Sequence, residues 1–184
     1  MGLVNAQPCV AAVHRDAEHR FSKRSADHIH VIAGIGVEGD AHAGGRIQHL
    51  SRMRADPSQP NLRQVHLIQV ELFEELADKG FAVQPGDLGE NITTRGIDLL
   101  GLSRDAILRI GADVVLKVTG LRNPCAQIEA FSPGLLKHLA VKVDNQIIRK
   151  AGVMSVAIRG GNACVGDRIR AEQISSEHIP LERV

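Results

Sequence analysis

Residues 114–125 read Val-Val-Leu-Lys-Val-Thr-Gly-Leu-Arg-Asn-Pro-Cys. The first six of them have the alternation that favours a half-buried β-strand. Gly120 then frees the backbone to turn. Asn123 is a suitable N-cap, and Pro124 fits the first position of a helix, where a missing N–H costs nothing. The stretch therefore predicts a strand that leads through a turn into a helix, with Cys125 in the first helical turn.

Cys125 in that turn would lie close to unpaired backbone N–H groups and to the positive end of the helix dipole, both of which favour an anion. Arg122 adds a positive charge three residues earlier. These surroundings favour the thiolate, which is the form of cysteine that attacks sulfur or ligates a metal. The alternative is a small buried cysteine at the end of a strand, which is common in protein cores.

The composition excludes some classes of function. The chain has 184 residues and a net charge of +1, so we expect one domain, 1–184, with no overall attraction to nucleic acid or membrane. Trp and Tyr are absent and there are only 4 Phe, which leaves little aromatic surface for stacking bases. The 18 Gly and 7 Pro indicate many turns, as in a β-rich fold.

The three cysteines, Cys9, Cys125 and Cys164, lie far apart, and none belongs to a Cys-x-x-Cys pair. This pattern does not indicate a disulfide framework or a structural zinc site. No apolar run reaches the length that spans a membrane. We therefore expect a cytoplasmic protein, with Cys9 and Cys164 as structural residues.

Periodicity predicts further strands and helices along the chain. We expect a helix over 69–79 that ends at Gly80, a short helix after Cys125 and a helical piece over 135–140. We expect strands over 9–14, 28–32, 65–68, 90–94, 107–111, 113–119, 147–149, 153–158 and 167–170. Polar residues 46–63 predict a long surface excursion that could cover a site. The fold class is mainly β, a barrel with a few short helices, and an α+β fold is the alternative.

Two glycine-rich stretches stand out. Residues 34–45 hold five glycines, without the spacing of a dinucleotide-binding or phosphate-binding loop. In residues 85–94, Gly89 would let the backbone approach a ligand closely, while Asn91 and Thr93 offer neutral donors and acceptors. A hairpin turn would use the same residues, so that reading remains the alternative.

The order and spacing of five motifs resemble the MOSC domain family, named for the C-terminal part of molybdenum cofactor sulfurases. The likeness is to its stand-alone, YiiM-like members and covers roughly residues 8–172. The motifs are Glu-Gly-Asp-Ala-His-Ala-Gly at 38–44, Gly-Asp-Leu-Gly-Glu-Asn-Ile-Thr at 86–93, Thr-Gly-Leu-Arg-Asn-Pro-Cys at 119–125, Gly-Val-Met at 152–154 and Val-Gly-Asp at 165–167.

The resemblance implies a β-barrel-like fold and a pocket for the molybdenum cofactor (molybdopterin), with Cys125 as the metal ligand or as a persulfide carrier. Ser22-Lys23 is similar to an early contact of the family, so Lys23 is a candidate phosphate partner, with Arg122 as a second. The candidate donors to the pterin or phosphate are Asn91, Thr93 and Asn123. Glu90 is interpreted as a structural brace, with proton donation as the alternative.

Asp40 and His42 match the family's Gly-Asp-x-His. They could line the substrate mouth and move a proton, since imidazole groups titrate near neutral pH. The alternative is a turn in which Asp40 caps backbone amides. A metal site of Asp40, His42 and His49 is a further option, although no helical metal motif accompanies it.

These readings lead to two main hypotheses. The first is a molybdenum cofactor-dependent oxidoreductase that reduces N-hydroxylated bases or related N–O compounds, with electrons from a separate reductase, because the chain has no iron–sulfur cysteine set and no flavin motif. The second is a carrier of sulfur or of the cofactor, without turnover of its own, which would receive sulfur from a cysteine desulfurase. A cofactor-free metal hydrolase that uses the histidines is a third hypothesis.

Overall fold

A large mixed β-sheet is the centre of the protein. The computed structural model describes residues 7–46 and 58–184; most of the expected excursion at 46–63, together with His49, lies outside this range. All neighbouring strands of the sheet pair antiparallel except β5 and β6, which are parallel. Across the sheet the strands are β13 (Ile169–Glu172), β7 (Ile107–Ile110), β8 (Val114–Leu121), β11 (Val153–Arg159), β5 (Val65–Gln69), β6 (Ile92–Arg95), β1 (Cys9–Arg15) and β2 (Arg24–Ala26).

The sheet curls but is not closed into a barrel, so the mainly β class is confirmed and the expected barrel closure is wrong. Within the described chain, β13 returns to β1 only through an isolated bridge between Cys9 and Arg168. The sheet stays open because both edges of β1 are already used. One edge pairs with β2 over Val13 to Arg15, and the other edge pairs with β6. Only the first residues of β1 remain for β13, and Pro8 before them has no N–H to extend the ladder.

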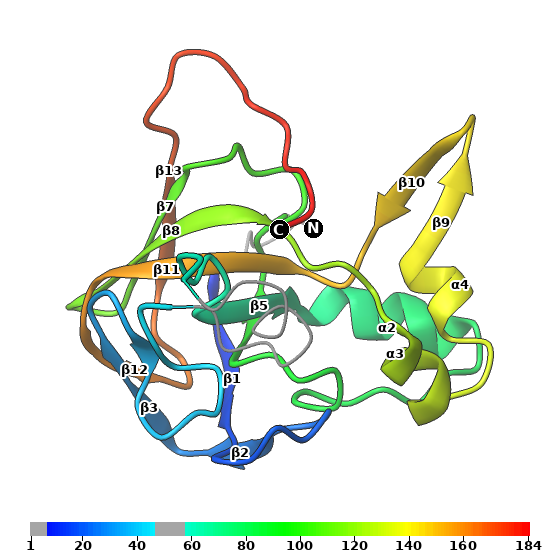
Figure 1. Ribbon diagram of the computed structural model, residues 1–184, viewed down its shortest axis with the longest axis horizontal. Helices are drawn as coiled ribbons and strands as arrows, with labels where there is room; N and C mark the ends of the chain where they lie inside the picture. Colours follow the sequence, from blue (N-terminus) through cyan, green and yellow to red (C-terminus); the bar gives the residue numbers. More distant parts are fainter. Residues whose placement is uncertain (1–6, 47–57) are drawn as a thin grey trace, which may run out of the picture.

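Two smaller sheets complete the fold (Figure 1). The first is a three-stranded sheet of β12 (Gly161–Cys164), β3 (His28–Ile32) and β4 (Gly36–Val37). The second is a hairpin of β9 (Ala140–Val143) and β10 (Gln146–Arg149), which projects from the body of the molecule. A main core of Val, Ile, Leu and Ala joins the large sheet to the three-stranded sheet, with Ile29, Leu67, Leu108 and Leu116 fully buried.

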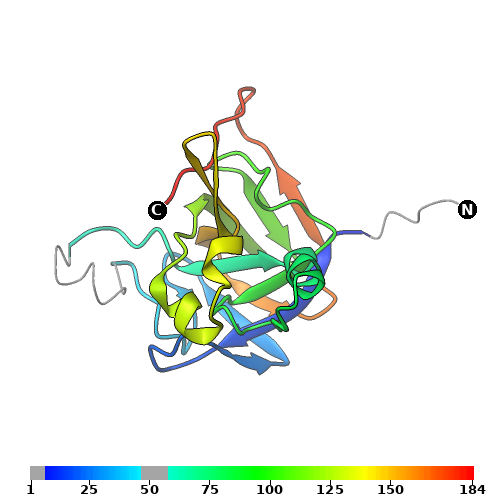
Figure 2. The same ribbon diagram turned by 90° about the vertical axis from the view of Figure 1, so that its right-hand side faces the viewer.

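The helices are short and share a second core. They are α2 (Val70–Asp78), α3 (Ala126–Phe131) and α4 (Leu136–Leu139). Their buried faces pack around Leu72, Leu76, Ile128 and Leu139, and Figure 2 shows them gathered at one end of the large sheet. Loop residues Leu88 and Ala151 belong to the same core. The helical core thus holds the loops that precede β6 and β11 beside the entrance to α3.

The predicted local elements are largely confirmed. The 107–119 hairpin forms between β7 and β8, and the 69–79 helix is α2, which ends before Gly80 at φ +86°. The helical piece at 135–140 is the single turn α4, after which the chain becomes β9 at Ala140. Strands β2, β4, β9 and β12 were not predicted. They are short or largely exposed, so they carry no clear alternation.

Gly152 precedes β11 and has no room for a side chain. Its φ is +85°, and a Cβ there would meet the carbonyl oxygen of Leu67 at 2.1 Å. We expect Gly152→Ala to lower the free energy of unfolding by about 2–4 kcal/mol, because left-handed strain and backbone overlap add together. Gly80→Ala is the matched control, since its φ is +86° but nothing lies within 4 Å; we expect it to cost about 1 kcal/mol. Equal losses in urea unfolding would contradict the overlap.

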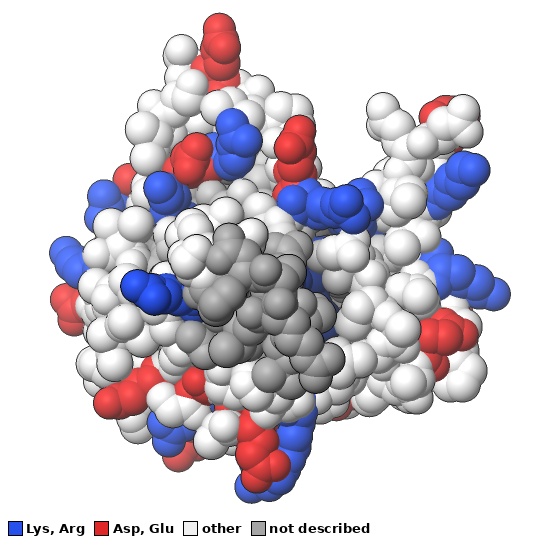
Figure 3. Space-filling view, in the orientation of Figure 1, with Lys and Arg blue, Asp and Glu red and all other residues white. Residues whose placement is uncertain are grey.

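Basic and acidic side chains are interspersed on the face shown in Figure 3. Among the described helices, none is long and apolar enough to cross a membrane.

Candidate functional site

Cys125 lies at the entrance of α3 and is partly exposed. All three cysteines are free, and the nearest polar partner of the Cys125 sulfur is Oε1 of Gln127 at 3.6 Å. The expected N-cap at Asn123 is wrong: the helix begins at Ala126, and Cys125 itself occupies the cap with φ −126° and ψ 170°. Asn123 instead uses its side-chain oxygen to accept a hydrogen bond from Nε of Arg149 at 3.0 Å.

Arg122 places a buried positive charge close to this thiol. Its guanidinium donates to the carbonyl oxygen of Leu88 at 2.7 Å and lies 5.7 Å from the centre of the Phe21 ring. Burial lowers the pKa of Arg122, while the nearby Cys125 and Glu90 act to raise it. Arg122 therefore has Cys125 and Glu90 as its electrostatic neighbours. The thiol of Cys125 is therefore partly exposed and lies close to a positive charge.

The loop 86–89 is fastened to residues 21–23 of the chain. A Cβ on Gly89 would meet the carbonyl oxygen of Phe21 at 2.4 Å, and one on Gly86 would meet the carbonyl oxygen of Lys23 at 2.7 Å. The Ser22 hydroxyl donates to the carbonyl of Asp87 at 2.7 Å. The close approach expected at Gly89 is thus made to the protein's own backbone, and the hydroxyl of Ser22 is used within it.

Asp40 is the centre of a buried polar network. Lys23 Nζ lies 2.9 Å from its Oδ1 and 2.8 Å from its Oδ2, and the amide of Asn91 donates to Oδ2 at 3.0 Å. The backbone N–H groups of His42 and Asp16 also donate to this carboxylate. Burial alone would raise the pKa of Asp40, but the hydrogen bonds from His42 and the charge of Lys23 outweigh it and hold that pKa well below its usual range. Asp40 therefore remains ionised at neutral pH, and the expected amide-capping turn is present.

His42 is the member of this network that reaches the surface. Its Nδ1 lies 3.4 Å from Oδ1 of Asp40, at the outer limit of a hydrogen bond, and its side chain is 32% exposed. Its ring packs edge-on against His19 at 5.3 Å between centroids. Of the Asp40–His42 pair, only the imidazole is therefore placed to exchange a proton with solvent or a substrate.

Lys23, Asn91 and Thr93 are held by partners inside the protein. Burial lowers the pKa of Lys23 against the raising effect of Asp40, and the ammonium lies within hydrogen-bond distance of both oxygens of that carboxylate. Asn91 donates to Asp40 and to the carbonyl of His14, and it accepts the N–H of His66. Thr93 donates to Glu90. A cofactor would have to displace these bonds to take Asn91 or Thr93 as donors.

Glu90 is a buried acceptor beside the same network. Its Oε1 accepts the N–H of Gly86 at 2.6 Å and the hydroxyl of Thr93 at 2.9 Å, while Oε2 is buried without a hydrogen-bond partner in the described structure. Burial raises the pKa of Glu90. Its charge acts on both Lys23 and Arg122, so the Asp40 network and the Cys125 entrance share one electrostatic neighbourhood.

The sequence reasoning missed two buried histidines beside this network, His14 and His66. Both ring nitrogens of His14 lack a hydrogen-bond partner in the described structure, and His66 Nε2 lies 2.8 Å from the carbonyl oxygen of Ala151. Burial and the charge of Lys23 lower the pKa of His14 to about 4; burial and the charge of Arg122 hold that of His66 well below its usual range. The only signal in the sequence was a histidine inside or at the end of an apolar strand.

His14 predicts how stability depends on pH. Its pKa is near 6.5 in the unfolded chain and about 4 in the folded protein, so between these values only the unfolded chain takes up the proton. We expect the free energy of unfolding to fall by about 3 kcal/mol through His14 as the pH drops from 6.5 to 4, with His66 acting in the same direction. Urea unfolding across this range should show a smaller fall for His14→Leu. An equal fall in both proteins would contradict the assignment.

The expected three-residue metal site is not supported. Within residues 7–46 and 58–184, no group of three His, Cys, Asp or Glu side chains is placed to hold a metal ion. His49, the third residue of that option, lies outside the described residues. In the described structure, Asp40 is already bound by Lys23, Asn91 and backbone amides, which leaves its carboxylate no free face.

Comparison with known proteins gives one family match and several similar structures. The model of the family described as the MOSC domain matches residues 40–170. The YuaD protein from Bacillus subtilis has a similar structure, with a TM-score of 0.76 and 21% identity over 92% of this chain and 98% of that one. YiiM from Geobacillus stearothermophilus has a TM-score of 0.65 and 13% identity, over 94% and 79% of the two chains. YiiM from Escherichia coli has a TM-score of 0.62 and 17% identity, over 95% and 73%. No curated protein matches in sequence.

Proposed function

Because the chain belongs to the MOSC domain family, we propose that it binds a molybdenum cofactor through Cys125 and reduces N-hydroxylated bases or related N–O compounds. The family match covers Asp40, His42, the 86–93 loop and Cys125, whereas Lys23 lies before its first residue. The observation that carries the proposal is the thiol of Cys125, which is free and partly exposed with the buried charge of Arg122 as its neighbour.

The residues at the entrance of α3 fit such a group. A soft, unpaired thiolate is a suitable ligand for molybdenum, and Cys125 has only a weak contact with Gln127 to give up. Arg122 supplies a fixed positive charge for an anionic ligand, although its guanidinium also holds the carbonyl of Leu88. The ammonium of Lys23 is paired with Asp40 and both amide donors of Asn91 are used, so we assign them to positioning rather than to direct binding.

The reaction breaks one N–O bond. Two electrons and two protons convert the N-hydroxylated group into an amine and water, and a separate reductase supplies the electrons. When bound, the cofactor supplies the two-electron redox chemistry. His42, which is partly exposed, delivers a proton from its imidazole, while the ionised carboxylate of Asp40 holds the backbone of His42 in place.

The test is turnover of a hydroxylaminopurine by protein purified from a host that makes the cofactor, with a reductase and its electron source present. We expect the aminopurine to form, and we expect none from protein made in a host that lacks the cofactor. Cys164→Ala, which removes another free and partly exposed thiol, is the matched control and should retain turnover. No product from the cofactor-loaded wild type would contradict the proposed activity.

Persulfide carriage is the second candidate, and the same accessible thiol favours it. In this case Cys125 would receive a sulfur atom from a cysteine desulfurase and pass it to another protein. Mass spectrometry after incubation with a desulfurase distinguishes the two. A stable added sulfur on Cys125, together with no turnover of the hydroxylaminopurine, would replace the first function by the second.

A further inference from the structure

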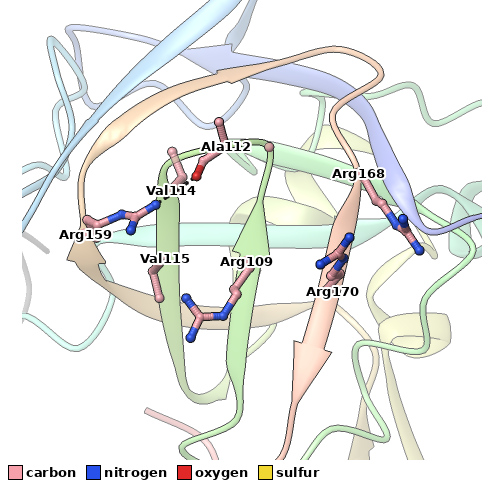
Figure 4. A pocket seen from close by; sticks show the side chains of 8 residues that line it. Arg109, Ala112, Val114, Val115, Arg159, Arg168 and Arg170 are labelled. Atoms are coloured by element: carbon pink, nitrogen blue, oxygen red, sulfur yellow. Dashed lines mark hydrogen bonds between the residues drawn. The ribbon is translucent and has the colours of Figure 1, made fainter.

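A polar pocket lies at the opposite end of β8 from Cys125. It has a volume of about 240 Å³ and is formed by β7, β8, β11 and β13 (Figure 4). Val114 and Val115, at the start of β8, belong to it, whereas Cys125 follows the end of that strand. An eight-residue strand spans about 25 Å, so the two sites are separate. The pocket is lined by Arg109, Gly111, Ala112, Val114, Val115, Arg159, Arg168 and Arg170.

Four of these lining residues are arginines, and two of them are register partners on neighbouring strands. Arg109 of β7 pairs with Arg170 of β13, and Figure 4 shows the guanidinium of Arg109 turned toward β8. Like charges directly opposite each other in a sheet are destabilising. Glu172 relieves part of this repulsion, since its Oε1 lies 2.7 Å from Nε of Arg109. A bound anion would relieve the remainder.

The other two arginines differ in how firmly they are held. Arg159 donates to the carbonyl oxygens of Asp113 at 2.5 Å and Ala112 at 2.8 Å, which fixes its guanidinium at the rim. Arg168 follows the turn that leads into β13 and is exposed. Among the described residues, no side-chain hydrogen bond or close ion pair holds the guanidinium groups of Arg168 and Arg170, although the charge of Arg170 acts on Glu172. The pocket thus combines two arginines already anchored within the protein with two whose donors remain for a ligand.

We propose that this pocket binds a small anion that carries two or more phosphate groups. The planar fork of a guanidinium matches phosphate oxygens, and charge-assisted hydrogen bonds of this kind are among the strongest that proteins make. On a measure by which about 10–15 Å³ holds one water molecule, the volume leaves room for more than one phosphate group. The lining has no aromatic ring to stack a base, and its apolar part is limited to Ala112, Val114 and Val115. The phosphate groups, not an organic body, are therefore what the pocket recognises.

The test is titration of the full-length protein with pyrophosphate by isothermal calorimetry at low salt. We expect binding to wild type and at least about a tenfold higher Kd for the Arg168→Gln/Arg170→Gln double variant. Glu172→Gln removes the carboxylate that competes for Arg109, so this variant should bind several-fold more tightly. Arg95→Gln is the control, because Arg95 is an exposed arginine of β6 paired with Glu74 outside the pocket; its Kd should match wild type.

Three results would overturn the assignment. The first is an equal Kd for wild type and the double variant, which would place binding elsewhere. The second is binding of citrate as tight as that of pyrophosphate, which would make the pocket a general carboxylate and phosphate surface. The third is binding of a short single-stranded oligonucleotide at least tenfold tighter than that of pyrophosphate, which would make it a nucleic-acid surface. None of these results bears on Cys125, so the two proposals fail separately.

Discussion

Replacing Cys125 by alanine is expected to lower turnover of the hydroxylaminopurine by at least about a hundredfold while the unfolding temperature changes by less than about 2 °C. In the proposed function this sulfur is the protein's bond to the metal, and losing even an outer partner of a metal site commonly costs about ten- to a hundredfold. The stability effect is small because the side chain is partly exposed and its sulfur makes a weak hydrogen bond to Gln127 at 3.6 Å.

Two further variants separate the role of the sulfur from its size. Cys125→Ser keeps the shape but offers a harder oxygen ligand, so it should lose turnover as Cys125→Ala does. Cys164→Ala removes a free cysteine of β12 and should remain active. Full turnover in both Cys125 variants would show that the thiol takes no part in the chemistry.

Asp40→Asn is expected to lower the free energy of unfolding by about 3–5 kcal/mol, the second large effect. Asp40 is the partner of Lys23, and the two side chains are 0% and 4% exposed. Removing one member of a buried pair leaves the other as an uncompensated charge, which is far more costly than losing a surface pair. Urea unfolding at pH 7 measures the loss, and Glu74→Gln, which breaks the exposed pair with Arg95, should change stability by less than about 1 kcal/mol.

The pH dependence identifies the cause of that loss. Burial already lowers the pKa of Lys23 while Asp40 raises it, so in Asp40→Asn the ammonium should lose its proton more readily. A neutral amine has no charge to compensate, and the destabilisation should therefore shrink as the pH is raised toward alkaline values. The double variant Lys23→Met/Asp40→Asn should be more stable than Asp40→Asn at neutral pH. A loss that is constant with pH and unrelieved in the double variant would rule out the unpaired charge.

The elements that the sequence predicted well are those whose signal is local. The 107–119 hairpin was predicted from the alternation of its consecutive residues. Helix α2 was predicted from its apolar spacing and from the glycine that follows it. The sheet closure was predicted wrongly because it depends on which edge of β1 remains free, and β2, three residues long, occupies part of that edge. The position of Cys125 at the cap depended on Arg149, a distant residue that binds Asn123.

Four of the residues that the sequence analysis named lie together in the structure, but their contacts differ from the expected ones. Lys23, Asp40, His42 and Asn91 do come together, but as one buried network in which Asp40 takes most of the donors. A charge that lies 17 residues away in the chain gives no sign that it will be a partner. Donors expected to face a ligand can therefore be used up inside the fold. Only tertiary contacts reveal which polar groups are already paired and which, like the Cys125 thiol, remain available.

Molybdenum content is the most direct measure of whether Cys125 holds the cofactor. Wild-type protein and Cys125→Ala should be purified side by side from a host that makes the cofactor, and their metal determined by elemental analysis. We expect about one molybdenum atom per wild-type chain and almost none in Cys125→Ala. Wild-type protein without molybdenum, or equal molybdenum in both proteins, would contradict the assignment of Cys125 as its ligand.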